Sequence, residues 1–110
     1  MNDVSLSLAT TELYDPAVGS FLSGGAMNLA RVQFAGVTLQ DGTVLVCGGS
    51  GYSAAAELFD SAGGTFAATG MMSEFRTGHT ATLLADGRVL VAGGWNNDSL
   101  IIPTAELYVP

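Results

Sequence analysis

The fold of this chain is decided by DGTVLVCGG at residues 41–49 and its repeat, DGRVLVAGG, at residues 86–94. Asp-Gly is a preferred pair for a two-residue β-hairpin turn, because both positions tolerate positive φ. The VLV run that follows is rich in β-branched residues, which favour strands. Each copy therefore predicts a tight turn and then a strand, at 43–48 and again at 88–93. Their antiparallel partners are predicted immediately before the turns, at 33–39 and 78–84.

The repeat extends over almost the whole chain. Residues 11–49 align without a gap with residues 56–94, and a third start, TAELY at 104–108, follows after four extra residues. Further strands are predicted at the start of each copy, ending on Tyr or Phe, and around Phe21 and Phe66 after an Asp-rich turn. We therefore expect an N-terminal tail or remnant at 1–10 and a repeat region at 11–110. Its copies are expected at 11–55, 56–103 and, in part, 104–110.

The strand at 43–48 is apolar on both faces. Val44 and Val46 lie on one face, and Leu45 and Cys47 on the other. An antiparallel sheet with one solvated face would carry polar residues on that side, so both faces of this strand must be covered. No apolar pattern of helical period extends beyond about a turn. Stacked four-stranded blades, as in a β-propeller, would bury such a strand on both sides.

The complete pattern resembles the kelch repeat, in the form found in bacterial propellers and in the galactose-oxidase-like superfamily. It consists of an arginine, an apolar strand, DG-x-VLV-x-GG and then AELYD-x-x-x-G-x-F. The first copy departs from it at Gln33 and Phe34, where the second has Gly78 and His79. The absence of a Trp-Asp pair disfavours WD-type propellers. The resemblance implies an all-β, incomplete propeller of about two to two and a half four-stranded antiparallel blades, because repeat folds stack several units.

An incomplete propeller would expose two blade faces and unpaired strand edges. We therefore expect the chain to be a fragment of a longer product, or a protomer that associates with further propeller blades or with itself.

Composition excludes two classes of partner. The formal net charge is -7, with three arginines and no lysine, so nucleic acid would be repelled. Apolar stretches of about five residues are far shorter than the roughly 20 needed for a membrane-spanning helix. The chain shows no signal peptide, while the resemblance to exported bacterial proteins favours a secreted or cell-surface location.

The repeat also separates structural charges from candidate functional ones. Nine of the thirteen charged residues recur in the same slot of different copies, which indicates roles in the fold. We expect each repeated arginine to pair with a glutamate or to bind backbone carbonyls, and the aspartates to form turns. The nine are Glu12, Glu57, Glu106, Asp15, Asp60, Asp41, Asp86, Arg31 and Arg76.

Cys47 and His79 occupy slots that hold Ala92 and Phe34 in the other copy, so packing explains both residues. One cysteine and one histidine cannot by themselves assemble a zinc or copper site. We therefore predict no catalytic residues, no metal and no cofactor, and a chain that is not an enzyme. Two alternatives stay open. The chain could be a non-catalytic part of a carbohydrate-active, galactose-oxidase-like enzyme, or a truncated structural fragment without activity of its own.

The two copies differ most in the loop after the double glycine. SGYSAAAE in the first copy corresponds to WNNDSLIIPTAE in the second, which is four residues longer. Loops in this position lie on one face of a propeller, where binding surfaces commonly form. We therefore predict an interaction module that contacts a protein or glycan ligand through Tyr52, Trp95, Asn96, Asn97 and Asp98. The alternative is that Trp95 packs on the neighbouring blade and Leu100 to Pro103 cover an edge.

Overall fold

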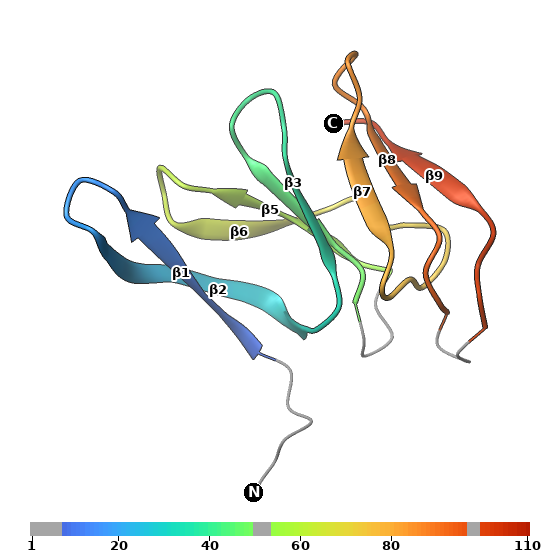
Figure 1. Cartoon of the computed structure of the whole chain (residues 1–110), viewed down its shortest axis with the longest axis horizontal. Coiled ribbons are helices and arrows are strands. Elements are labelled where there is room, and N and C mark those ends of the chain that lie inside the picture. The colour runs from blue at the N-terminus through green and yellow to red at the C-terminus, as the bar shows by residue number, and fades with distance from the viewer. Residues whose placement is uncertain (1–7, 50–53, 97–99) are drawn as a thin grey trace, which may run out of the picture.

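The computed structural model of this protein describes residues 8–49, 54–96 and 100–110 (Figure 1). These ranges contain nine β-strands, all paired antiparallel, and no helix. The strands are β1 (Leu8–Asp15), β2 (Ser20–Arg31), β3 (Ala35–Thr38), β4 (Val44–Cys47), β5 (Ala56–Asp60), β6 (Thr65–Thr69), β7 (Thr80–Leu83), β8 (Val89–Ala92) and β9 (Ala105–Tyr108). The predicted all-β class is confirmed.

The strands form three sheets in chain order (Figure 1). The first sheet is β1-β2, the second is β3-β4-β5-β6 and the third is β7-β8-β9. Within each sheet, strands that are consecutive in the chain pair with one another. The second and third sheets use equivalent registers, because Leu45 lies opposite Leu58 in one and Leu90 lies opposite Leu107 in the other.

The first sheet is longer than predicted. β1 begins at Leu8, three residues before the expected start of the repeat region, and β2 runs for 12 residues to Arg31. Between the pairs Thr10↔Ala26 and Glu12↔Ser23, β2 carries one residue more than β1, which is a β-bulge. Gly25, with a φ of 86°, lies within this bulge. The bulge lets β2 continue past the glycines and pair with all of β1.

Turns form at both predicted Asp-Gly pairs, but the two-residue form with positive φ at both positions is wrong. The Leu39 N–H bonds the Thr43 carbonyl and the Leu84 N–H bonds the Arg88 carbonyl, so each turn holds three residues, and only its glycine has a positive φ. Gly42 and Gly87 have φ values of 91° and 92°, and the Asp41 Oδ1 atom accepts hydrogen bonds from the Thr43 hydroxyl and N–H. These bonds, the hydroxyl first, lower the pKa of Asp41 below its usual 3.8. In the equivalent turn, Asp86 accepts a bond from the Arg88 N–H. The repeated aspartates therefore order the turns.

The two ends of the sheets differ. One end, called here the turn end, carries the turns at 16–19, 39–43, 61–64 and 84–88. The opposite end, called the loop end, carries residues 32–34, 48–49, 77–79, 93–96 and 100–102. The two ends are defined by the direction of the strands. β4 and β8 each begin at a turn of the turn end and run towards the loop end.

The main core lies between the second and third sheets. Its buried residues are Ala35, Leu39, Leu45, Cys47, Ala56, Val89 and Val91. Leu45 and Cys47 face the third sheet, while Val46 on the other side of β4 is also buried. The prediction that this strand is covered on both faces is confirmed. Both faces of β4 are covered because its sheet lies between the first and third sheets.

Candidate functional site

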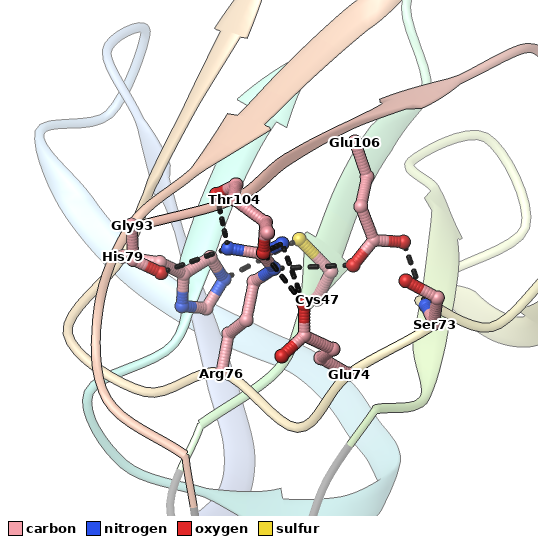
Figure 2. Close-up of polar contacts among 8 residues, drawn as sticks. All are labelled: Cys47, Ser73, Glu74, Arg76, His79, Gly93, Thr104 and Glu106. Carbon is pink, nitrogen blue, oxygen red and sulfur yellow. Dashed lines mark hydrogen bonds and ion pairs between the residues drawn. The ribbon is translucent and has the colours of Figure 1, made fainter. Parts of the chain in front are cut away.

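A buried arginine anchors the segment between β6 and β7 to the third sheet (Figure 2). Arg76 is fully buried, and its Nε donates to the Glu106 carboxylate at 3.1 Å. Its Nη1 donates to the carbonyl oxygens of Gly93 and Thr104, at 3.0 and 2.9 Å. The Ser73 N–H donates to the other Glu106 oxygen at 2.6 Å. We call this arrangement the arginine clamp.

The same clamp occurs one repeat earlier. Arg31 bonds Glu57 at 2.9 Å and the carbonyl oxygens of Gly48 and Ala55 at 2.7 and 3.0 Å. Both side chains of this ion pair are buried, and the Asn28 N–H donates to the second Glu57 oxygen. The prediction that the repeated arginines pair with glutamates and bind carbonyls is therefore confirmed for both. Arg31, at the end of β2, thus links the first sheet to the second, whereas Arg76 holds the segment before β7 on the third sheet.

The clamp controls the ionisation of Glu106. Burial would raise the pKa of this carboxyl, but hydrogen bonds from Ser73 and Arg76 together outweigh that effect and lower the pKa below 4.5. Glu106 is thus ionised at neutral pH and paired with a cation. A carboxylate held in this way is poorly suited to take up or release a proton.

Cys47 and His79 meet beside the clamp (Figure 2). The Cys47 Sγ and His79 Nε2 atoms are 3.7 Å apart, and both residues are buried. Burial raises the pKa of the Cys47 thiol to about 11 and lowers the pKa of His79 below 6.5. At neutral pH the thiol is therefore protonated and the imidazole uncharged. Neither is prepared for nucleophilic or acid chemistry.

Gly48 explains why His79 and Cys47 come so close. With a φ of 74°, its backbone passes the third sheet so tightly that an added Cβ would lie 2.4 Å from the His79 ring. The neighbouring Gly49 N–H donates to the carbonyl oxygen of Arg76 at 2.8 Å. The first double glycine thus allows the close approach of two sheets.

Trp95 lies at the loop end, directly after the second double glycine. Its N–H and carbonyl both bond to Thr77, at 2.9 and 3.0 Å, and its ring covers Gly78. The ring packs on Gly78, two residues before β7, and Trp95 is still 46% exposed. The structure therefore holds an aromatic ring in a fixed position and leaves about half of it open to solvent.

The residues before β3 bond to the segment on which this ring packs. Gln33 has a φ of 57°, the only positive value for a non-glycine residue in the described ranges, and its carbonyl accepts a bond from the Gly78 N–H at 2.9 Å. Gly78, the equivalent residue in the second copy, has a φ of 66°. Gln33 thus keeps a conformation that favours glycine, and it lies between Val32 and Phe34 at the loop end.

The loop end gathers exposed apolar side chains. They come from the segment before β3 and from the loop after β8, and they are Val32, Phe34, Trp95, Leu100 and Ile101. Ile101 is the most exposed of them, at 78%, and it forms an isolated bridge with Trp95. The turn end carries the repeated aspartates and, in the turn between β1 and β2, the exposed Val18. The loop end is therefore the candidate binding surface.

The predicted site residues have different outcomes. Trp95 and Asn96 lie at the loop end, where the Asn96 N–H donates to the Leu100 carbonyl and its Oδ1 accepts from the Leu100 N–H. Tyr52, Asn97 and Asp98 lie outside the described residues. The sequence analysis did not identify Val32 and Phe34 as surface residues. In the sequence, this segment is marked only by Gln33 and Phe34 of the first copy, which differ from Gly78 and His79 in the second.

No protein-family model and no curated protein matches the sequence of this chain. The kelch resemblance stays a prediction. In the described part of the chain, no group of three His, Cys, Asp or Glu side chains is placed to hold a metal ion. Within those same residues, no helix is long and apolar enough to cross a membrane.

Proposed function

We propose that this protein is a kelch-type interaction module, part of a larger propeller, that binds a protein partner through its loop end. The observation that carries the proposal is the exposed apolar surface around Trp95. Exposed apolar side chains that gather at one end of a protein, here with Ile101 bridged to Trp95, commonly mark an interface. Aromatic residues held in place are frequent anchors of such interfaces.

The contrast between the two ends supports this assignment. The turn end displays the carboxylates of Asp15, Asp41, Asp60 and Asp86, which favour hydration. At the loop end the repeated arginines are buried in the clamps and do not contribute exposed charge. An apolar partner surface would therefore lose little solvation energy on docking at the loop end, and much more at the turn end.

The exposed faces of the outer sheets support the propeller part of the proposal. Phe59 and Tyr14 occupy the same repeat position, but Phe59 is 7% exposed beside the first sheet and Tyr14 is 56% exposed. Leu58 packs against the core, whereas its equivalent Leu107 is 47% exposed. Tyr14 and Leu107 are therefore exposed at positions where the equivalent residues of the second sheet pack against a neighbouring sheet. Further blades, from the same or another polypeptide, would cover them.

A glycan is the second candidate ligand. It is favoured by the pairing of an exposed Trp95 ring with the amide side chain of the neighbouring Asn96. An apolar ring with adjacent polar groups suits a sugar, because it offers one flat apolar face and hydrogen-bonding groups at its rim. The two candidates differ in what they require. A glycan depends on Trp95 and Asn96, whereas a protein partner would also use Phe34 and Ile101.

The experiment is site-specific photo-crosslinking. A benzophenone amino acid is placed at Ile101, which is 78% exposed at the loop end, and in a control variant at Val18, which is 67% exposed at the turn end. We expect covalent protein adducts from position 101 and none from position 18, with loss of the adducts in a Trp95→Ser background. Equal adducts from both positions would contradict the proposal. Glycan-array binding abolished by Trp95→Ser, without protein adducts, would establish the glycan alternative instead.

A further inference from the structure

Two backbone hydrogen bonds join the second and third sheets at the loop end. The Gly49 N–H donates to the Arg76 carbonyl at 2.8 Å, and the Gly78 N–H donates to the Gln33 carbonyl at 2.9 Å. Gly49 follows β4 and Gln33 precedes β3, whereas Arg76 and Gly78 both precede β7. We call this pair of bonds the loop-end junction. Because each bond crosses from one sheet to the other, the junction exists only while these segments stay in contact.

His79 lies inside this junction (Figure 2). It follows Gly78 directly and is only 8% exposed, and its ring packs on Gly48, where an added Cβ would lie 2.4 Å from it. The Nε2 atom faces Cys47, 3.7 Å from Sγ. The other ring nitrogen, Nδ1, is buried without a hydrogen-bond partner among the described residues. An uncharged ring carries one N–H, but a protonated ring carries two and would need an acceptor at both nitrogens.

The ionisable groups around this ring do not compensate a positive charge on it. They come from β4 and from the two arginine clamps, and they are Cys47, Arg31, Glu57, Arg76 and Glu106. The carboxylate of each clamp is already paired with its own arginine, and the Cys47 thiol is uncharged at neutral pH. Burial lowers the pKa of His79 and the charge of Arg76 lowers it further, while a hydrogen bond with the Cys47 backbone offsets only part of this. A protonated His79 would therefore be a third buried cation beside Arg31 and Arg76.

The contacts nearer to the turn end do not involve His79. Leu39, Leu45 and Val89 are buried in the core between the same two sheets. The Gln40 side chain donates to the Ala85 carbonyl at 3.4 Å, between the turns at 39–43 and 84–88. An opening at the loop end would therefore leave the core and the turn end in place.

We propose that uptake of a proton by His79 opens the loop-end junction, which makes this end of the protein a pH-sensitive switch. The proton comes from solvent and adds to a ring nitrogen. The charged ring reaches water only if the segment before β7 moves away from Gly48, and this movement breaks both junction bonds. It also separates Phe34, beside β3, from the segment on which the Trp95 ring packs. The opening does not rest on the binding function proposed for that surface, although it would act on it.

Hydrogen exchange followed by NMR measures the opening directly. The reporters are the N–H groups of Gly49 and Gly78, which donate the junction bonds, and the controls are those of Leu39 and Leu84, which donate within the turns. An opened ring titrates near pH 6.5, so lowering the pH from about 7.5 to about 5 favours the open form by about tenfold or more. After correction for intrinsic exchange rates, we expect the protection of Gly49 and Gly78 to fall by this factor and that of the controls to stay unchanged.

His79 is the only histidine in the chain, so its ring signals give a second reading in the unmodified protein. Where these signals show a protonated ring, the Gly49 and Gly78 N–H groups should have lost their protection. His79→Gln, which cannot take up a proton, should keep the same protection at both pH values. Unchanged protection of the two glycines down to about pH 5, an equal loss in His79→Gln, or a loss shared by Leu39 and Leu84 would each overturn the proposal.

Discussion

Replacing Arg76 with methionine tests whether the arginine clamp, which holds the segment between β6 and β7 on the third sheet, stabilises the fold. The substitution keeps much of the side-chain length but removes every hydrogen bond to Glu106, Gly93 and Thr104. Removing one partner of a buried ion pair costs about 3–5 kcal/mol, because the other charge is left without compensation. A domain of this size has a total stability of about 5–15 kcal/mol. We therefore expect Arg76→Met to lose a large fraction of the free energy of unfolding.

The assay is urea and thermal unfolding followed by circular dichroism. With about 4 °C or more per kcal/mol for a domain near 100 residues, the melting temperature should fall by about 15 °C or more. Arg88→Met is the matched control, because Arg88 pairs with Asp86 at 2.8 Å but both side chains are about half exposed. An exposed pair contributes at most about 1 kcal/mol. Equal losses for Arg76→Met and Arg88→Met would refute the clamp.

Two further variants keep the test informative if Arg76→Met does not fold. Arg76→Lys retains the charge but cannot reach Glu106 and two carbonyl oxygens at once, so it should be less stable than the wild type and more stable than Arg76→Met. Arg76→Met combined with Glu106→Leu removes both charges and should recover part of the lost stability. A double variant less stable than Arg76→Met alone would show that the ion pair is not the source of the loss.

Three other properties follow from the same structure. Burial lowers the folded-state pKa of His79 below 6.5. The stability that the uncharged His79 gives is therefore complete above pH 6.5 and is lost as the pH drops below it. Urea midpoints between about pH 5 and 8 should show this loss in the wild type and a smaller one in His79→Gln. Gly78→Ala should lower the free energy of unfolding more than Gly64→Ala, although both residues have a φ of 66°. Only the alanine at position 78 would place a Cβ 2.7 Å from the Trp95 ring. Unfolding curves and tryptophan emission would measure the difference. The Cys47 thiol, with a pKa of about 11, should react slowly with a disulfide reagent at about pH 8 and quickly in urea, and fast labelling of the folded protein would contradict its burial.

Much of the fold follows from the chain read as a repeat. The strands, the turns and the antiparallel order depend on residues that are close together in the chain. They could therefore be predicted from the Asp-Gly pairs, the apolar residues and the 45-residue spacing. The arginine clamps were also predictable. An arginine and a glutamate that recur together in each repeat can form an ion pair, which compensates both charges when they are buried. The bulge around Gly25 was not predicted, since its effect depends on how far β1 continues beside β2.

The candidate surfaces needed the tertiary structure. Tyr14, Phe59 and Tyr108 stand in nearly identical local sequences, yet one is exposed, one is buried beside another sheet and one borders an apolar groove. Exposure depends on what other segments cover a residue, and local sequence does not record that. Gln33 shows the same limit, because it has a left-handed backbone and accepts a bond from Gly78, a residue 45 positions later in the chain. The sequence alone determined that residues 86–94 and their repeat form paired strands, through turn chemistry and β-propensity. Only the packing of one sheet against the next decided which repeated positions became core and which remained open for binding.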